Sequence, residues 1–586
     1  MGTNQVSEFQ ARHARAEPAL TKVEAGPQFD EVGCIVRHWF PACAGMTSAS
    51  AGRVSGRHVF GIVKLVIGRP DRNFALPPLI PTVHLEKPSV KTFQQTPGCF
   101  AFLIAITFAV SPAANAGDWT QWRGNDRNGV ASDSPSLLSS LPDNGLKAAW
   151  VSEPIGSGKN EGGWGSPVVA SFPGNETAEQ RVFLFTHKRV KVGDVPKKKF
   201  PWLAPPKRVG MSDAEYAEYE VQRRNEDEAL AKAYVFRETI YCLNADDGKE
   251  IWKNETDSVY TRFPQSGSPT VADGRLYILG AGGHVRSVDA LTGKSIWKVR
   301  LPVSFRDEFW QSSFLITDDL AIFLAGHLYA VSLEDGSIAW EGDPKKTSGT
   351  HTSPVLWHHD GTNFVVLNAG GGTSICVEAA TGKEVWSVKS EAGLSTPVVS
   401  GDRLITYSNS RKKGMRCFKM STDGAEEQWV FNGCQDKGSS PVVVGDYVYV
   451  QGEKRLACVN LETGDSEWMT TMDVGQPQYT SLVAADSKVY YALEGVLCVE
   501  ATPEEFTPLF NAKIDDAGLL NTEDALRKLH GVNALAKESQ GKAEKLYQSK
   551  IGRQGPLTCA TPAIADGKMY VRLKNALACY DLRADK

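Results

Sequence analysis

One phrase recurs along this chain at nearly constant intervals. It consists of a short strand, a tight Thr-Gly or Asp-Gly turn, and a tryptophan on the strand that follows, as in VDALTGKSIWKV at 288–299. A second phrase, Ser/Thr-Pro before an apolar strand and an Asp-Gly turn, recurs at steps of 41 to 44 residues where no insertion intervenes, with Ser313 and Leu482 in the place of the proline. Repeats with a period of about 40 to 50 residues indicate an array of supersecondary units.

The tryptophan position is filled in seven copies, and Phe510 stands near it in a degenerate one. Each tryptophan is expected to pack between neighbouring repeats. These residues are Trp150, Trp252, Trp297, Trp340, Trp386, Trp429 and Trp468.

Each repeat predicts four short strands, because apolar residues alternate with a period of two between Gly, Asp and Asn turns. A lone four-stranded unit leaves an apolar face exposed, so neighbours must stack, and radial closure protects the sheet edges. The last repeat ends after its third strand, whereas 145–153 reads as an unattached fourth strand with Trp150. We therefore predict an all-β, eight-bladed β-propeller of four-stranded antiparallel blades, with the last blade closed by this N-terminal strand.

Two insertions, 190–236 and 515–556, interrupt the repeats of the predicted propeller domain at 117–586. The first contains a helical pattern that follows Ser212, with Glu215 in the place of a capping box. The second also reads as helical, over 521–547. Connections between blades and turns between second and third strands open on the same face of a propeller. Both helical insertions are therefore expected to border one mouth of the central channel.

The N-terminal region carries a different signal. An apolar run within 96–116 ends in Ala-Asn-Ala before Gly117. Its apolar core is too short to span a bilayer and fits the core and cleavage site of a secretory signal. We predict export to the periplasm or the medium through a cleaved signal. Residues 1–95 show no repeat and no coherent core, and we expect them to be unstructured or an over-extended gene start.

The repeated TGKxxW phrase resembles the PQQ-repeat, quinoprotein alcohol dehydrogenase-like propellers over roughly 118–586. The opening DWTQWRGNDRNGV at 118–130 is similar to the N-terminal segment of secreted members. A lipoprotein would carry a cysteine just after the apolar run, where this chain has Ala116-Gly117, so the resemblance is to a secreted, non-lipoprotein member. It implies the propeller fold and leaves function open, because one fold hosts many functions.

The resemblance to dehydrogenases of that family implies a set of cofactor-binding and catalytic residues. Adjacent disulfide-bonded cysteines usually flank their quinone, calcium is held by carboxylate and amide oxygens, and an Asp acts as base. This sequence has no adjacent cysteines, and the calcium ligands find no matching positions. PQQ with calcium therefore stays an open alternative, and no cofactor is assigned.

The eleven cysteines do not indicate disulfides. Six occupy one position of the third strand, and Ser287 and Ala330 fill that position in other repeats, so it requires a small buried residue. Equivalent positions of different blades lie beyond the Cα separation of about 7 Å that a disulfide can bridge. Cys434 and Cys559 lie outside this position and are the remaining candidates for redox chemistry. The six are Cys242, Cys376, Cys417, Cys458, Cys498 and Cys579.

The loops before the Ser/Thr-Pro positions should converge over the central channel, and we predict a ligand-binding site there. Cations are in excess among their polar residues, which favours an anionic or polyhydroxyl ligand. No metal site is predicted, because His351 and the pair His358 and His359 fall at opposite ends of a strand. The predicted mouth residues are Lys159, Glu161, Arg262, Arg306, Glu308, Gln311, His351, Arg411, Lys437, Gln478 and Arg553.

These features favour an exported scaffold that binds a small polar or anionic ligand or another exported protein. The main alternative is a PQQ-dependent dehydrogenase of alcohols or sugars, and a cofactor-free hydrolase or lyase is a third. No catalytic residue is assigned. A net charge of −4 gives no basic face for nucleic acid. We expect a monomer without a transmembrane anchor in the mature chain.

Overall fold

Eight β-sheets are arranged in the part of the chain that the computed structural model describes, residues 117–173, 179–304, 308–475 and 479–584. The expected extension 1–95 and signal 96–116 lie outside these residues, as do Arg306 and Gln478 of the predicted mouth. Trp202–Val209 is a unit separate from the other described residues. It holds the 3-10 helix η2 (Pro205–Arg208), where the Arg208 guanidinium lies 5.5 Å from the centre of the Trp202 ring.

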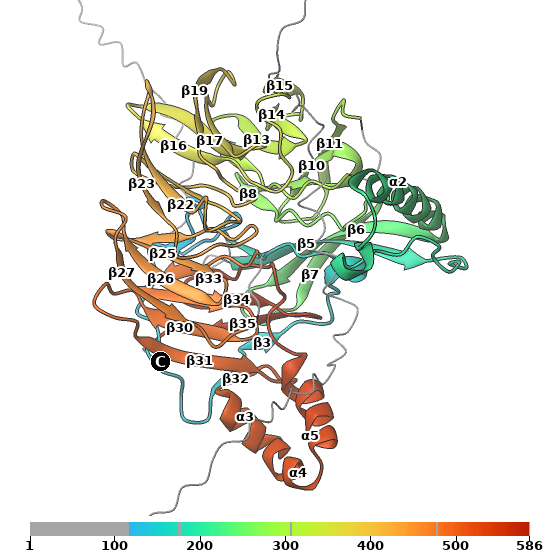
Figure 1. Ribbon diagram of the computed structural model, residues 1–586, viewed down its shortest axis with the longest axis vertical. Helices are drawn as coiled ribbons and strands as arrows, with labels where there is room; N and C mark the ends of the chain where they lie inside the picture. Colours follow the sequence, from blue (N-terminus) through green and yellow to red (C-terminus); the bar gives the residue numbers. More distant parts are fainter. Residues whose placement is uncertain (1–116, 174–178, 305–307, 476–478, 585–586) are drawn as a thin grey trace, which may run out of the picture. The chain divides into compact units, whose positions relative to one another are not determined.

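Seven of the sheets are four-stranded antiparallel blades, and six of these take four consecutive strands (Figure 1). Their strands are β4 (Val168–Phe172), β5 (Glu179–Lys191), β6 (Tyr234–Asn244) and β7 (Glu250–Ser258); β8 (Thr270–Ala272), β9 (Arg275–Leu279), β10 (His284–Asp289) and β11 (Ser295–Arg300); β12 (Leu315–Thr317), β13 (Leu320–Ala325), β14 (His327–Ser332) and β15 (Ile338–Glu341); β16 (Val355–His359), β17 (Thr362–Ala369), β18 (Thr373–Glu378) and β19 (Glu384–Lys389); β20 (Val398–Ser400), β21 (Arg403–Tyr407), β22 (Met415–Ser421) and β23 (Gly424–Phe431); and β24 (Val442–Val444), β25 (Tyr447–Gly452), β26 (Arg455–Asn460) and β27 (Ser466–Thr471).

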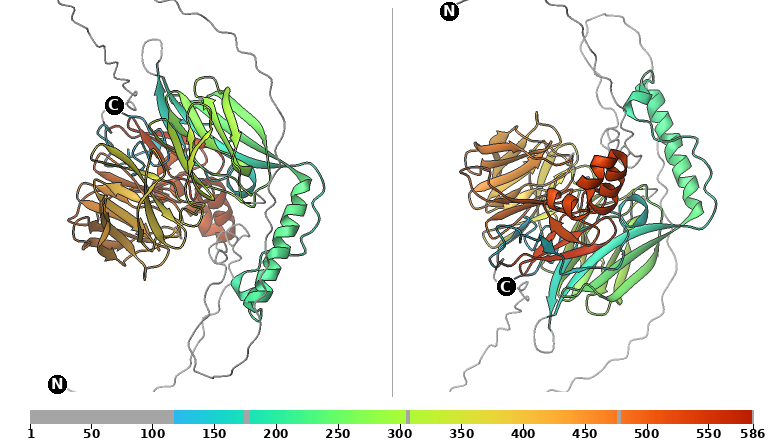
Figure 2. Two further views of the ribbon diagram at one scale, coloured as in Figure 1. Left: turned by 90° about the horizontal axis from the view of Figure 1, so that it is seen from above. Right: turned by 90° about the horizontal axis from the view of Figure 1, so that it is seen from below.

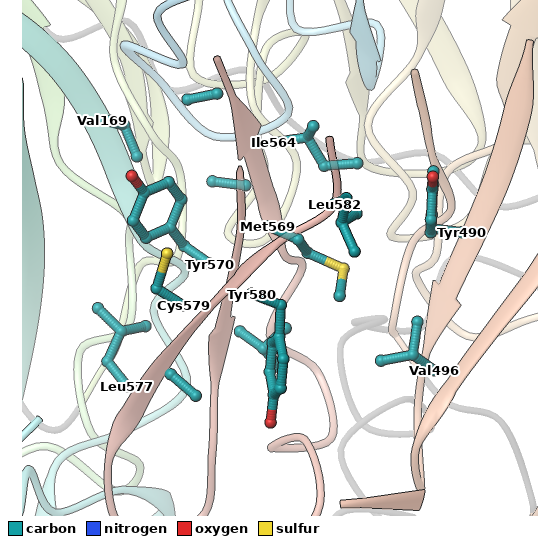
Figure 3. Packing of buried hydrophobic residues seen from close by; sticks show 14 of the residues in the cluster. Val169, Tyr490, Val496, Ile564, Met569, Tyr570, Leu577, Cys579, Tyr580 and Leu582 are labelled. Atoms are coloured by element: carbon teal, nitrogen blue, oxygen red, sulfur yellow. The ribbon is translucent and has the colours of Figure 1, made fainter. Parts of the chain in front are cut away.

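The seventh blade joins the two ends of the described chain. Its strands are β33 (Ala563–Ala565), β34 (Lys568–Arg572), β35 (Leu577–Asp581) and the N-terminal β3 (Trp150–Val151). Trp150 pairs with Cys579 in an antiparallel register, so the N-terminal strand closes the last blade as the repeat pattern predicts. Figure 3 shows buried side chains on both faces of this blade, with Tyr570 and Cys579 on one side and Met569 and Tyr580 on the other.

The remaining sheet differs from the expectation of eight four-stranded blades. It contains β28 (Val483–Ala485), β29 (Lys488–Ala492), β30 (Val496–Glu500) and β31 (Pro508–Ile514), with β1 (Val130–Ala131) added parallel to β28 at one edge. At the other edge it gains β32 (Leu519–Asn521) and β2 (Leu146–Lys147), so it has seven strands. The structure therefore has seven four-stranded blades, not eight. The added strands are two or three residues long, and such short strands carry no periodicity that a sequence could reveal.

The innermost strands touch one another in a continuous cycle, which runs β4, β8, β12, β16, β20, β24, β28, β33 and back to β4. Hydroxyl groups follow the same cycle, because the backbone N–H of one Ser/Thr position donates to the hydroxyl of the next. A backbone donor at a blade junction needs such a partner, which explains why the position requires Ser or Thr. These hydrogen bonds run from Ser166 to Ser268, Ser268 to Ser313, Ser313 to Ser353, Ser353 to Thr396, Ser440 to Ser481, and Thr561 to Ser166.

These hydrogen bonds correct one assignment. Ser313 was expected in the place of the proline, but its hydroxyl accepts from Ser268 and its N–H donates to Ser353. Ser313 is therefore the hydroxyl residue of its blade, and Phe314 stands where other blades have proline. The aligned sequence SSFLIT has two serines in a row, so spacing alone could not separate the two registers.

The tryptophans lie between blades. Each pairs across the sheet with the small residue of the cysteine position, as Trp252 does with Cys242 and Trp340 with Ala330. A turn glycine of the next blade lies under five of the rings, those of Trp150, Trp252, Trp297, Trp340 and Trp429, and a Cβ at Gly382 would come within 2.5 Å of the Trp340 ring. An indole N–H donates to a backbone carbonyl oxygen of the next blade at Trp150, Trp252, Trp297, Trp340, Trp429 and Trp468.

Helices occupy the two insertions and two connections. α2 (Asp213–Leu230) starts after Ser212, whose hydroxyl accepts from the N–H of Glu215 while the Glu215 carboxylate accepts from the N–H of Ser212. Figure 2 shows α2 as a rod beside the blades and α3 to α5 as a separate group. No described helix is both long and apolar enough to cross a membrane. The other helices are α1 (Gly158–Glu161), η3 (Ala231–Ala233), η4 (Ala281–Gly283), α3 (Glu523–Leu529), α4 (Val532–Glu538), α5 (Gln540–Tyr547) and η5 (Gln548–Gly552).

Candidate ligand-binding site at the channel mouth

The loops that lead into the inner strands lie at one end of the cycle, which we name the mouth. Four successive loops there contribute Lys159, Arg262, Phe263, Phe309 and His351, which we name the aromatic–cation cluster. The Phe263 and Phe309 ring centres are 5.0 Å apart, edge to face, and the Phe309 and His351 ring centres are 5.5 Å apart. The Lys159 Nζ lies 5.6 Å from the Phe263 centre and the Arg262 Cζ lies 5.9 Å from the Phe309 centre. Such cation–ring contacts stabilise by about 0.5–1 kcal/mol each.

The backbone around Lys159 is fixed by a buried arginine. Arg572, at the end of β34, donates from Nη1 to the Gly165 carbonyl oxygen at 2.5 Å and from Nη2 to Gly156 and Gly162 at 3.2 and 3.3 Å. These glycines flank α1, so one guanidinium holds the loop that carries Lys159. Burial lowers the pKa of the Lys159 ammonium to about 8, and the positive charge of Lys198 adds to this effect. Part of the Lys159 population is therefore a neutral amine near neutral pH.

The imidazole of His351 is neutral under the same conditions. Burial lowers the pKa of His351 to about 4. Its Nδ1 lies 2.6 Å from the hydroxyl oxygen of Thr350, and its ring meets the edge of Phe309. The neutral ring can exchange hydrogen bonds with a ligand but adds no charge to the mouth.

The first insertion reaches this side of the mouth. Arg224 of α2 lies 3.4 Å from the Glu308 carboxylate, in the loop that enters β12. Gln311 of the same loop donates its N–H to the Thr350 carbonyl at 2.7 Å and its side-chain amide to Pro264 at 3.4 Å. Glu308 and Gln311 therefore connect neighbouring loops and α2.

A second group lies on the loops that enter β24, β28 and β33. The buried Asp436 carboxylate accepts backbone N–H groups of Gly438, Ser439 and Tyr479 at 2.9, 2.7 and 3.0 Å. The Cys559 N–H donates to the Thr480 hydroxyl at 3.0 Å. The predicted Lys437 follows Asp436 on this side. Asp436 thus holds two loops together through one carboxylate.

The other predicted residues take separate positions. The Arg411 Nε lies 2.9 Å from the Glu453 carboxylate, so these two turn residues form an ion pair. Arg553 follows η5 and donates its N–H to Gln548, and Glu161 is exposed at the end of α1. Ring and cation–ring contacts join Lys159, Arg262 and His351 into one cluster, whereas Arg411 and Arg553 contact Glu453 and Gln548.

Sequence reasoning missed Phe263 and Phe309, because only charged and polar residues of the entry loops were considered. It also missed Asp436, beside the predicted Lys437, and Arg572, which lies at the end of β34 and not in an entry loop. Two signals were available. Phe263 and Phe309 directly follow Arg262 and Glu308, so an aromatic residue recurs beside a predicted charge. Asp436 stands three residues before a serine in a turn sequence, where an Asp side chain commonly accepts backbone N–H groups.

PQQ with calcium can be tested against these donors. The mouth cations suit the carboxylates of a quinone, but a calcium ion also needs protein carboxylate oxygens. Glu308 is paired with Arg224, Glu453 with Arg411, and the Asp436 carboxylate accepts three backbone N–H groups. These three carboxylates of the described mouth are engaged as they stand and do not fit a calcium site.

Among the described residues, one group of potential metal ligands lies in the second insertion, at Asp515, Asp516 and His530. The His530 Nε2 is 2.9 Å from Asp515, and the Lys550 Nζ is 2.5 Å from Asp516. A hydrogen bond and an ion pair therefore account for this group.

Comparison with known proteins adds the family. A family model described as outer membrane protein assembly factor BamB matches residues 231–355 and 324–517. BamB of Moranella endobia is 26% identical over 247 residues, which are 38% of this chain and 60% of that protein. Subunit 1 of the methanol dehydrogenase [cytochrome c] of Methylobacterium organophilum is 26% identical over 137 residues, 22% of this chain and 20% of that protein. The chain therefore matches only part of the length of each relative.

Two solved dehydrogenase structures also match this chain. The quinohemoprotein alcohol dehydrogenase of Comamonas testosteroni has 10% identity and a TM-score of 0.45, covering 81% of this chain and 82% of its own. A europium-containing methanol dehydrogenase has 11% identity and a TM-score of 0.43, covering 80% and 98%. Together with the repeated tryptophan phrase and its four-stranded blades, the sequence matches show that the chain belongs to the PQQ-repeat β-propeller family.

Proposed function

We propose that this protein is an exported binding scaffold whose mouth holds a small polar or anionic ligand, or an acidic segment of another exported protein. The observation that supports this most directly is the aromatic–cation cluster. It brings two cations and a neutral imidazole from separate blades to one wall of the mouth, on a backbone fixed by Arg572. A relative named as an assembly factor is consistent with a scaffold role.

Calorimetry with citrate tests the ligand class, because citrate presents several carboxylates at once. Arg262→Ala should weaken citrate binding about tenfold or more, since a charged hydrogen bond contributes about 1.5–3 kcal/mol. Lys298→Ala, at an exposed position of β11, is the matched control and should bind like the unchanged protein. Equal affinity of Arg262→Ala and Lys298→Ala would remove the cluster from the binding site.

A PQQ-dependent dehydrogenase of alcohols or sugars is the second candidate. The match to a methanol dehydrogenase subunit supports it. The ion pairs of Glu308 with Arg224 and of Glu453 with Arg411 make a calcium site at these carboxylates less favourable. Adding PQQ and calcium chloride, then measuring dye reduction with a panel of alcohols and sugars, distinguishes the two. Dye reduction would establish the dehydrogenase, whereas citrate binding without dye reduction would retain the scaffold.

We also propose that residues 96–116 form a cleaved signal and that 117–586 is the mature propeller. N-terminal sequencing of the exported protein should then begin at Gly117. Recovery of residues 1–95 in the exported chain would contradict this assignment.

A further inference from the structure

The segment DWTQWRGNDRNGV at 118–130 is not explained by the proposed function. It borders the turn end of the inner strands, opposite the mouth. Gly117 lies beside Asp566 in the turn after β33, and the Leu137 N–H donates to Asp486 in the turn after β28, at 2.7 Å. Both turns stand at the far end of their inner strands. The segment therefore enters and leaves the propeller at the end opposite the mouth.

Between these points the segment bonds to three inner strands. Trp119 exchanges backbone hydrogen bonds with Val169 of β4, at 2.8 and 2.9 Å. The N–H of Val271 in β8 donates to Thr120, and the N–H of Ala484 in β28 donates to Gly129, both at 2.8 Å. Inner strands at different places in the cycle thus share this one segment as a partner.

Two buried arginines extend the segment to further blades. Arg123 donates from Nη1 to the Ser440 carbonyl at 3.0 Å and from Nη2 to the Pro441 carbonyl at 2.5 Å, just before β24. Arg127 donates from Nη1 to the Ser313 carbonyl at 3.1 Å and from Nη2 to the Phe314 carbonyl, just before β12. β16 and β20 lie between β12 and β24 in the cycle. The two guanidinium groups therefore connect blades that do not touch each other.

The local sequence is shaped for this arrangement. Arg123 and Arg127 both have left-handed backbone, with φ of 67° and 55°. A Cβ at Gly129 would lie 2.9 Å from the Arg123 guanidinium, and a Cβ at Gly124 would lie 3.2 Å from the Trp119 ring. In the sequence Arg-Gly-x-x-Arg-x-Gly, the two glycines thus leave room for the Arg123 guanidinium and the Trp119 indole.

Both guanidinium groups donate to uncharged acceptors. Arg123 meets carbonyl oxygens, and Arg127 meets carbonyl oxygens and the side-chain oxygen of Gln121. A guanidinium presents several N–H donors in a flat fork, which an ammonium cannot replace. Pairs of carbonyls at adjacent residues therefore select arginine over lysine.

We propose that 118–131 is a built-in ligand of this propeller, a plug that enters the channel from the end opposite the mouth and whose two arginines reach the entry ends of β12 and β24 and connect these two blades. The binding surface that it occupies is a pair of carbonyl cages, each made by two successive residues ahead of an inner strand. This proposal does not depend on any ligand at the mouth.

Hydrogen exchange in Arg123→Lys and Arg127→Lys tests the plug, because lysine keeps the charge and loses the fork. Arg127→Lys should speed amide exchange in β12 and in 118–131, and Arg123→Lys in β24 and in 118–131, by about tenfold or more. Arg275→Lys is the matched control, since Arg275 donates to the Leu333 carbonyl at 2.8 Å outside this segment. It should leave 118–131 unchanged.

Two results would overturn the plug. One is unchanged exchange of 118–131 and of both inner strands in the two lysine variants. The other is an acceleration spread evenly over all blades, which is general destabilisation. If either variant fails to fold, amide exchange in the unchanged protein tests the proposal instead. Its amides at Trp119, Val169, Val271 and Ala484 must exchange as slowly as those of the blade cores, and exchange at loop rates would refute the proposal.

Discussion

At the residue scale, the seven tryptophans are not equivalent. The Trp297 indole donates to the Leu333 carbonyl at 3.0 Å, whereas the Trp386 Nε1 has no hydrogen-bond partner among the described residues. The blade after Trp386 writes STDGAEEQW in place of the Thr-Gly turn, and its Gly424 faces open space. The altered turn in the sequence therefore indicates that Trp386 docks differently from Trp297.

Substituting phenylalanine at the two positions measures this difference. Trp297→Phe should lower the free energy of unfolding by about 0.5–1 kcal/mol more than Trp386→Phe, because it removes the indole donor of the Leu333 carbonyl, which then keeps only the Arg275 guanidinium. Alanine at either position should cost about 3–5 kcal/mol, since both rings are buried. Denaturant unfolding provides the values. Equal losses for the two phenylalanine variants would show that the indole hydrogen bond contributes nothing.

Lys159 gives the proposed anion site a pH dependence. Its ammonium loses a proton as pH rises through its pKa of about 8, so citrate should bind more weakly above that pH. His351, with a pKa of about 4, stays neutral throughout and adds no change. Lys159→Arg keeps the charge and should abolish the dependence between about pH 7 and pH 9. Calorimetry across that range decides, and an equal pH dependence in Lys159→Arg would exclude Lys159 as its source.

At the element scale, the sequence predicted the strands of the regular blades and the start of α2 after Ser212. Local chemistry determines both, through alternation with a period of two and through a capping box. β1, β2 and β32 escaped prediction, because two or three residues acquire a partner only from the tertiary fold. Only the polar members of the aromatic–cation cluster were predicted, for a related reason. Arg262 and His351 are polar and were collected, whereas the phenylalanines between them act through packing.

Turn glycines connect the elements of neighbouring blades, and two of them form a matched pair. Gly382 and Gly361 have φ of 69° and 75°, but a Cβ at Gly382 would meet the Trp340 ring at 2.5 Å, and one at Gly361 would meet nothing within 4 Å. Gly361→Ala should cost about 1–2 kcal/mol from left-handed strain alone. Gly382→Ala should cost clearly more in denaturant unfolding. Equal costs would show that the indole does not need the bare glycine.

At the scale of the whole molecule, the chain closes its ring with residues from both ends. β3 completes the last blade, while β2 and β1 enlarge the neighbouring sheet and 118–131 spans inner strands. Repeats alone could predict β3, because its Trp150 belongs to the repeat. They could not predict the enlarged sheet. They also could not predict the contacts of Arg123 and Arg127, because the acceptors are backbone carbonyls, which every sequence contains.

Three N-terminally truncated chains separate the contributions of 118–131 and of the N-terminal strands to stability. A chain that begins at Gly117 keeps every described strand and should match the full chain in melting temperature. A chain that begins at Ser132 loses the segment and β1, and it should melt earlier but stay monomeric, because β3 still covers β35. A chain that begins at Pro154 also loses β2 and β3, which exposes two sheet edges and the apolar surface under Trp150, so it should aggregate. Light scattering and calorimetry measure both properties. If the chain from Pro154 is a monomer that melts with the chain from Ser132, then β3 does not close the ring energetically, whatever its pairing.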